Sequence, residues 1–219
     1  MKNKSILLAS VLLALLAFFG AARFYQSQQA ENMAAQGSVN SEQLVRAHAP
    51  VLGPADAKVT IVEFTDPACE TCAAFSPLVK GMVEQYPGQV KVVIRYAALH
   101  HGADQIVRML EAARLQKPYW PLLETLYQNQ AYWAQNHQAD ANKVAAIFMH
   151  EGVDMTRLAQ DMNSPAINAI VQQDEADRQA LKVDMTPGLF VNGKPLTEFG
   201  VGQFKALVAG EVARSYGQQ

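Results

Sequence analysis

The stretch from Pro50 to Cys72, PVLGPADAKVTIVEFTDPACETC, decides the fold. Its middle part, Lys58 to Phe64, is rich in β-branched residues and apolar on both faces, which is typical of a central strand buried in a sheet. Two cysteines follow this strand with the spacing CxxC, and a helical pattern begins at the second one. The stretch therefore predicts a buried strand that ends beside a cysteine pair at the start of a helix.

The segments after the cysteines complete a strand, helix and strand unit. Apolar residues recur at helical spacing up to Pro87 and Gly88, which end the helix, and Pro77 inside it should produce a kink. The next segment, Gln89 to Ala98 (QVKVVIRYAA), has the composition of a second strand. This order predicts a parallel pair of strands joined by a right-handed crossover.

A block of helices separates this unit from a final hairpin and helix. Helical patterns without a strand signal occur near residues 103–116, 119–130, 140–151, 154–162 and 164–181. Asn192-Gly193 lies between the short runs 188–191 and 194–198 and favours a type I′ turn, and a last helix is expected near 201–215. The whole order predicts an α/β fold, in which a small mixed sheet carries a helical insertion at about residues 100–181.

The composition excludes several classes of protein. Half of the 219 residues are apolar and 17% are charged, as in a globular protein, and the net charge of −2 provides no basic field for nucleic acid. The two cysteines permit at most one internal bridge, which excludes a disulfide-scaffolded mini-protein. His100 and His101 are adjacent and cannot share one face of a strand or helix, so we do not expect a metal-ligand set there.

The N-terminal segment predicts export. Lys2 and Lys4 precede an uncharged, apolar run over residues 5–22. Residues 1–22 are therefore interpreted as a signal peptide, cleaved after the small residue Ala22, or as an uncleaved membrane anchor, and the length of the run leaves both open. A buried core helix is a further alternative.

The segment that follows is expected to be a spacer. Residues 23–48 are polar and rich in Gln, which predicts a linker and a short helix that contribute no core. The folded domain is therefore expected at residues 49–219.

The cysteine pair carries the predicted chemistry. Cys69 should lie at or just before the helix N-terminus, where unpaired N–H groups and the helix dipole lower the pKa of its thiol and make it the nucleophile of disulfide exchange. Cys72, one turn inside the helix and more buried, would be the resolving thiol. Two alternatives remain: half of a zinc site, for which no second CxxC supplies ligands, and an inert pair in the core.

Two further features are expected near the cysteine pair. Glu63 is the one charge in its apolar strand, and a buried carboxyl there would have a raised pKa and accept the proton of Cys72. The alternative is a solvated carboxylate at an exposed strand end. Thr186-Pro187 precedes the hairpin, and its peptide bond is either cis, with the Thr186 backbone able to pair with a bound peptide, or that of an ordinary turn proline.

With these features, the chain resembles the DsbA-type thiol:disulfide oxidoreductases of the thioredoxin superfamily over residues 44–215. The resemblance rests on PVLGPADAKVTIVEFTDPACETC, on HHGADQIVRMLEAARLQKPYW after the second strand and on TPGLFVNGKPL near the end. It implies a thioredoxin fold with the helical insertion. It also implies that Cys69 is the exposed nucleophile, Cys72 the resolving cysteine and Glu63 the buried acid. The same resemblance implies a cis bond between Thr186 and Pro187, opposite the redox-active disulfide Cys69–Cys72.

The two residues between the cysteines, Glu70 and Thr71, depart from the family pattern. Many members have Pro-His or Pro-Tyr there, and a histidine helps to stabilise the thiolate. A carboxylate beside Cys69 opposes the helix dipole and should raise the pKa of the thiol, which makes the disulfide less oxidising. We therefore expect Glu70 and Thr71 to tune the active site.

Three functions are compatible with these features. The main prediction is an oxidase in the periplasm or at the extracytoplasmic face of the bacterial inner membrane, which introduces disulfides into secreted or envelope proteins and is reoxidised by a DsbB-type or other membrane partner. The second is a reductase or isomerase of the same fold, which Glu70 favours. The third is a copper or zinc metallochaperone that uses Cys69, Cys72 and a histidine. For the oxidase we expect thiol-containing or disulfide-containing protein substrates, no cofactor, no bound metal, no nucleic acid and a monomer.

Overall fold

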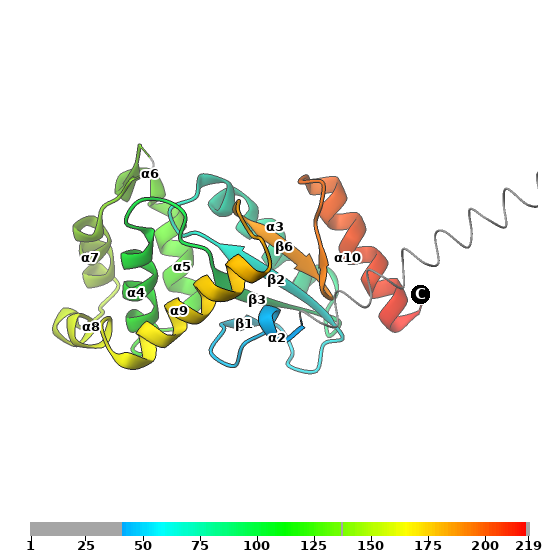
Figure 1. Ribbon diagram of the computed structural model, residues 1–219, viewed down its shortest axis with the longest axis horizontal. Coiled ribbons are helices and arrows are strands. Elements are labelled where there is room, and N and C mark those ends of the chain that lie inside the picture. Colours follow the sequence, from blue (N-terminus) through cyan, green and yellow to red (C-terminus); the bar gives the residue numbers. More distant parts are fainter. Residues whose placement is uncertain (1–40, 137, 218–219) are drawn as a thin grey trace, which may run out of the picture. The chain divides into compact units, whose positions relative to one another are not determined.

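The computed structural model describes residues 41–136 and 138–217, and a mixed five-stranded sheet forms the centre of this part (Figure 1). The strand order is β1-β3-β2-β6-β7. The strands span Val51–Leu52 (β1), Val59–Thr65 (β2), Val90–Tyr96 (β3), Gly188–Val191 (β6) and Lys194–Pro195 (β7). The pair β2 and β3 is parallel, as predicted, and the other pairs of this sheet are antiparallel. The predicted fold class is therefore confirmed.

The helices agree closely with the helical patterns of the sequence. They span Ser41–Leu44 (α2), Glu70–Gln85 (α3), Ala103–Ala113 (α4), Tyr119–Gln128 (α5), Gln130–Trp133 (α6), Ala141–His150 (α7), Met155–Asp161 (α8), Pro165–Ala180 (α9) and Val201–Tyr216 (α10). Figure 1 shows α4, α5, α7 and α8 gathered at one end of the sheet and α9 leading from them back along it. These helices form the predicted insertion between β3 and β6.

The two faces of the sheet contribute to different clusters of buried side chains. On one face, Ile61 of β2 packs in a large core with Val79 of α3 and Phe204 of α10, and this core continues into the helical insertion. On the other face, Val62 of β2 belongs to a smaller cluster that includes Leu44 of α2. Because alternate residues of β2 serve the two clusters, the strand is apolar on both faces.

The hairpin turn has the predicted geometry. Asn192 and Gly193 both have positive φ angles, 48° and 82°, which a type I′ turn requires. The second strand is shorter than predicted and ends at Pro195, because Thr197 and Glu198 are exposed and have no apolar face to bury against the sheet.

Three short strands are absent from the sequence-based prediction. β4 (Ala134–Gln135) and β5 (Gln138–Ala139) pair with each other inside the insertion, where helices alone were expected. β1 lies before the predicted strand at Lys58, where no strand was expected, and pairs with β3. Each has two residues, which is too short for the alternation that identifies a strand in a sequence.

The end of the predicted spacer is packed against the domain. The expected short helix is present as α2, but Leu44 is only 2% exposed and belongs to the smaller cluster. Arg46 forms an ion pair with Asp177 of α9, and the His48 ring lies within hydrogen-bond distance, 2.7 Å, of Asp174 on the same helix. The prediction of a segment without a core is therefore wrong for residues 41–48, because its partners lie far away in the sequence. Residues 1–40, including the predicted export signal, lie outside the described residues.

Among the described helices, none combines the length and the apolar character needed to cross a membrane.

Candidate active site

The two cysteines lie where the buried strand gives way to a helix. Cys69 is the N-cap of α3, with extended backbone angles, and Cys72 lies in the first turn. The two side chains are 3.4 Å apart and both thiols are free. Cys72 is fully buried, whereas Cys69 keeps 6% of its surface exposed. An incoming sulfur therefore has access to Cys69 only.

The surroundings of Cys69 favour its thiolate. The pKa of the Cys69 thiol is lowered from 9.0 to about 5, first by the hydrogen bond from Cys72 and then by hydrogen bonds from the Thr186 side chain and from the backbone N–H groups of Cys72 and Thr71. Burial opposes this shift. The lowered pKa agrees with the sequence-based expectation, but the Cys72 side chain contributes most to it and the N–H groups at the helix N-terminus contribute less.

The surroundings of Cys72 have the opposite effect. Burial raises the pKa of the Cys72 thiol, and so do the hydrogen bond to Cys69 and the charge of Glu63. Only Thr65 acts against this shift, through a hydrogen bond to Cys72. At neutral pH the reduced site therefore holds one thiolate, on Cys69, and one proton, on Cys72.

Glu63 lies on β2 beneath the dithiol and is 2% exposed. Burial raises its pKa from 4.5 to about 7, a hydrogen bond from Thr65 lowers it, and the charge of Cys69 raises it further. Its Oε1 atom is the one buried side-chain oxygen or nitrogen in the described part of the chain without a hydrogen-bond partner. The expectation of a buried carboxyl with a raised pKa is confirmed, and the alternative of a solvated strand end is wrong.

The loop before β6 closes the other side of the dithiol. The Thr186-Pro187 peptide bond is cis, as expected. The Sγ atom of Cys69 lies 3.5 Å from the carbonyl oxygen of Thr186, to which it donates a hydrogen bond when the thiol is protonated. Gly188, which follows Pro187, pairs with Phe64 of β2. The hairpin thus brings Thr186 and Pro187 to the cysteine pair from the distant end of the sequence.

The comparisons with known proteins agree with this geometry. A family model described as thioredoxin matches residues 46–209. The chain belongs to the thioredoxin family.

Similar proteins make the family assignment more specific. A thioredoxin-like oxidoreductase from Silicibacter pomeroyi DSS-3 is 28% identical, with a TM-score of 0.66 over 80% of this chain and 95% of that one. Disulfide bond formation protein D of Bacillus subtilis is 24% identical over 68% of this chain and 70% of its own length. These similarities confirm the resemblance to DsbA-type proteins and support a thiol:disulfide oxidoreductase of that type.

A third relative is much longer than this chain. The Na(+)/H(+) antiporter NhaA of Herminiimonas arsenicoxydans is 28% identical over 67% of this chain, but the chain spans only 22% of the antiporter. The similarity therefore concerns only a segment of that larger protein.

Two side chains that the sequence analysis overlooked hold the active-site loop of this thioredoxin-family protein. The carboxylate of Asp66, fully buried, accepts hydrogen bonds from the backbone N–H groups of Ala68, Leu99 and His100, and also contacts the His100 ring at 2.8 Å. Gln130 of the insertion donates from Nε2 to the carbonyl oxygens of Pro67, at 2.8 Å, and Cys69, at 3.0 Å.

Only the first of these two had a signal in the sequence. Asp66 is a charged residue directly after an apolar strand. Gln130 is a polar residue in a helix, a pattern that does not reveal its partner.

The described residues contain no group of three or more Cys, His, Asp or Glu side chains arranged to hold a metal ion.

Proposed function

We propose that the protein is an exported thiol:disulfide oxidase whose Cys69–Cys72 disulfide is transferred to protein substrates. The observation that carries this proposal is the division of charge in the reduced site, where the pKa of Cys69 is about 5 and Cys72 keeps its proton. A stabilised Cys69 thiolate stabilises the reduced protein relative to the disulfide. A protein whose reduced form is stabilised in this way gives its disulfide away readily.

The transfer takes place in two exchange steps. A substrate thiolate attacks Cys69 Sγ, the Cys69–Cys72 bond breaks, and its electron pair passes to Cys72 Sγ, which takes up a proton. A second substrate thiolate then attacks the substrate sulfur of the mixed disulfide and releases Cys69 as a thiolate. The substrate loses two electrons and two protons; the protein gains the electrons, Cys72 keeps one proton, and the other enters water.

Glu63 and Thr186 have separate roles in this scheme. Glu63, with a pKa of about 7, supplies the proton to Cys72 on reduction and accepts it on reoxidation. The backbone of Thr186 pairs with the substrate peptide beside Cys69, since the Thr186 carbonyl oxygen is already within 3.5 Å of Cys69 Sγ. Glu70 and Thr71 tune the potential of the pair.

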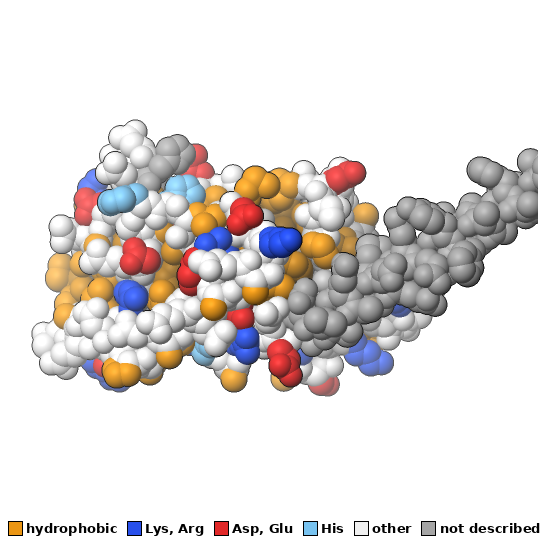
Figure 2. Space-filling view, in the orientation of Figure 1, with side chains coloured by type: hydrophobic (Ala, Val, Ile, Leu, Met, Phe, Trp, Pro, Cys, Tyr) orange, Lys and Arg blue, Asp and Glu red, His pale blue; other side chains and the backbone are white. Residues whose placement is uncertain are grey.

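An apolar surface beside Cys69 fits a protein substrate. Met185, next to Thr186, is 82% exposed, and Phe199, which packs against Phe75 of α3, is 54% exposed. Figure 2 shows hydrophobic side chains gathered over the region where Figure 1 places α3 and β6, with charged side chains beside them. Exposed apolar side chains next to a reactive sulfur favour an unfolded or extended segment of a substrate protein.

The compartment and the partner are also proposed. Residues 1–22 direct the chain across the membrane, and a DsbB-type or other membrane protein reoxidises Cys69–Cys72. A similar protein bears the name disulfide bond formation protein D, which supports the oxidising direction. Gel filtration is expected to show a monomer.

The reduction potential tests the proposal. The purified protein is equilibrated with glutathione buffers, free thiols are trapped, and the oxidised fraction is read by mass, with Cys72→Ser as the control that forms no internal disulfide. A potential near or above about −150 mV is expected for an oxidase. A value near the roughly −270 mV of thioredoxin would instead indicate a reductase, the alternative that Glu70 favours.

A further inference from the structure

The proposed exchange requires a proton to reach a place that water does not. Cys72 changes between a bonded sulfur and a protonated thiol in every cycle, yet it is fully buried, and Glu63 beside it is 2% exposed. A proton exchanged between these two groups must still be replaced from solvent. The inference about the path of this proton rests on the proposed function.

Thr65 connects the buried acid to the helical insertion. It lies two residues after Glu63 on β2 and therefore on the same face of the strand. Its hydroxyl lowers the pKa of both Glu63 and Cys72, because it can donate to either anion, and it lies 2.7 Å from the hydroxyl oxygen of Tyr127 on α5. Thr65 itself is fully buried, so Tyr127 is its connection outward.

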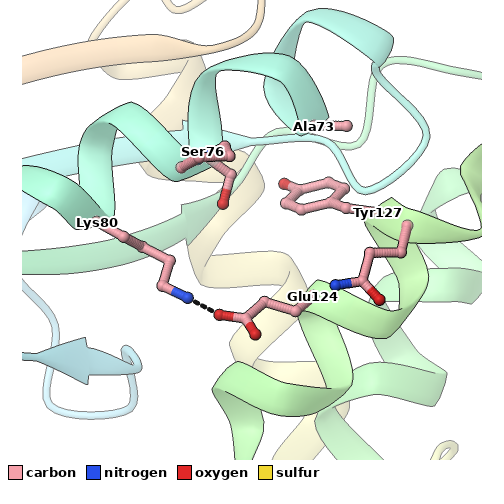
Figure 3. A pocket seen from close by; sticks show the side chains of 7 residues that line it. Ala73, Ser76, Lys80, Glu124 and Tyr127 are labelled. Atoms are coloured by element: carbon pink, nitrogen blue, oxygen red, sulfur yellow. Dashed lines mark ion pairs between the residues drawn. The ribbon is translucent and has the colours of Figure 1, made fainter.

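Tyr127 connects this buried hydroxyl to a cavity at the surface. The cavity, of about 290 Å³, lies between α3 and α5, and Figure 3 shows Tyr127 extending into it from α5 toward α3. It is lined by Ala73, Ser76, Pro77, Lys80, Glu124, Tyr127 and Gln128. Lys80 and Glu124 form an ion pair across it, and the side chain of Glu124 is 39% exposed, so water reaches the lining. A cavity of this volume has room for several waters, and Lys80 and Glu124 supply charged groups to bind them.

We propose that the hydroxyl groups of Thr65 and Tyr127 conduct protons between the Cys72–Glu63 pair and the water of this cavity. When the Cys69–Cys72 bond breaks, Cys72 takes its proton from Glu63. Thr65 then gives its hydroxyl proton to Glu63 and receives that of Tyr127, which is replaced from water. Each hydroxyl donates one proton and accepts one, so neither residue carries a charge at the end. Reoxidation runs the transfers in reverse.

The electrostatic surroundings are compatible with this role. Burial, followed by the charges of Glu63 and Cys72, raises the pKa of Tyr127, so its hydroxyl keeps a proton to donate. The titratable groups that act on Glu63 or are acted on by it come from two helices: Cys69 and Cys72 from α3, and Tyr119 and Tyr127 from α5. The hydroxyl of Tyr119 instead accepts a hydrogen bond from the hydroxyl of Tyr96. Neither Thr65 nor Tyr127 touches the substrate, and both act on the exchange through Glu63.

The test compares Tyr127→Phe with Tyr86→Phe, which removes the hydroxyl of a half-buried tyrosine at the far end of α3. The rate at which dithiothreitol reduces the Cys69–Cys72 disulfide is measured by stopped flow between pH 5 and 9. We expect Tyr127→Phe to slow the reaction about tenfold at pH 7 and to change its pH profile, while Tyr86→Phe leaves both unchanged. Because a conducting path changes rates in both directions equally, the reduction potential and the pKa of Cys69 should stay as in the unsubstituted protein.

A second pair of variants checks the inner hydroxyl. Thr65→Ser keeps a hydroxyl and should keep the rate, whereas Thr65→Val should slow the reaction as Tyr127→Phe does. A rate for Tyr127→Phe within twofold of the unsubstituted protein would overturn the inference. So would a change in the reduction potential that accounts for the whole change in rate, because the effect would then be one on stability of the reduced form. An unsubstituted protein that does not exchange at all would overturn the proposed function itself, and this inference with it.

Discussion

Two charged side chains are buried in neighbouring strands of the sheet, and their surroundings differ. Arg95 of β3 is fully buried and donates hydrogen bonds to Asp174 and Asp177 of α9 and to two main-chain carbonyl oxygens of α2. Glu63 of β2 is almost as buried, but its Oε1 atom has no hydrogen-bond partner in the described structure. The two residues lie on opposite faces of the sheet.

The difference separates a structural charge from a functional one. A buried charge that is fully paired fixes the elements around it, and Arg95 holds α2 and α9 against β3. A buried carboxyl without enough partners is expensive to ionise, so it holds its proton more tightly than an ordinary carboxyl and exchanges it near neutral pH. The face with the unpaired acid is also the face that carries the dithiol.

The largest expected effect follows from removing the structural charge. Arg95→Met would leave Asp174 and Asp177 buried without their main cation and should lower the free energy of unfolding by about 3–5 kcal/mol. Urea unfolding at pH 7 measures it, with Arg157→Met, which removes an exposed ion pair to Asp161, as the control expected to change less than about 1 kcal/mol. A loss below 1 kcal/mol for Arg95→Met would show that the buried cluster is not a stabilising unit.

Removing the functional charge, Glu63, should instead raise the free energy of unfolding, and the gain should depend on pH. Glu63 has a folded-state pKa of about 7 against 4.5 when unfolded, so the folded state binds the proton more tightly and stability falls as pH rises from 4.5 through 7. This displacement corresponds to about 3 kcal/mol. The stability that Glu63→Gln adds to the reduced protein should therefore be about 3 kcal/mol larger at pH 8 than at pH 4, in urea unfolding with a phosphine reductant. Equal effects at both pH values would contradict the raised pKa.

A smaller effect is expected where the insertion holds the active-site loop with a neutral side chain. Gln130→Leu removes the hydrogen bonds to the carbonyl oxygens of Pro67 and Cys69 and should lower the free energy of unfolding by about 1–2 kcal/mol. The exposed Gln172→Leu on α9 is the matched control. We also expect slower exchange at Cys69, since its loop is less well positioned. Stability equal to that of the control would show that these two bonds are exchanged for water without loss.

Much of the fold could be predicted because its signals are local. Helical periodicity, the doubly apolar strand β2 and the Asn192-Gly193 turn each depend on a few neighbouring residues. The strands β1, β4 and β5 could not be found in this way, because two residues form a strand only through the partner beside them.

The active site likewise contains residues with a local sequence signal and residues whose role depends on distant partners. The pair Cys69 and Cys72 and the buried Glu63 are visible in one short stretch of sequence. Arg95 is also a charge in a largely apolar strand, which it shares with Lys91, but its partners on α9 are 79 and 82 residues away. Tyr127 meets Thr65 across 62 residues, and nothing in a tyrosine at a helical position indicates that contact.

The smallest expected effect concerns Glu70, which is an acid near the dithiol, as Glu63 and Asp66 are. It lies in the first turn of α3, beside Cys69, but is exposed, unlike Glu63. Water and salt weaken its repulsion of the thiolate, so we expect Glu70→His to raise the reduction potential by only about 15 mV, or about 0.7 kcal/mol. Glutathione equilibration at low salt measures the change.

The matched control for this prediction is Glu84→His, an exposed acid near the other end of the same helix, which should leave the potential unchanged. Added salt should reduce the effect of Glu70→His, because an exposed charge is screened over about 10 Å at 0.1 M. A potential that stays the same or falls would mean that the residue between the cysteines does not set the direction of electron flow. In that case the hydrogen bonds to Cys69 from Cys72, from the Thr186 side chain and from the backbone would set it instead, and the alternative reductase would lose the feature that favours it.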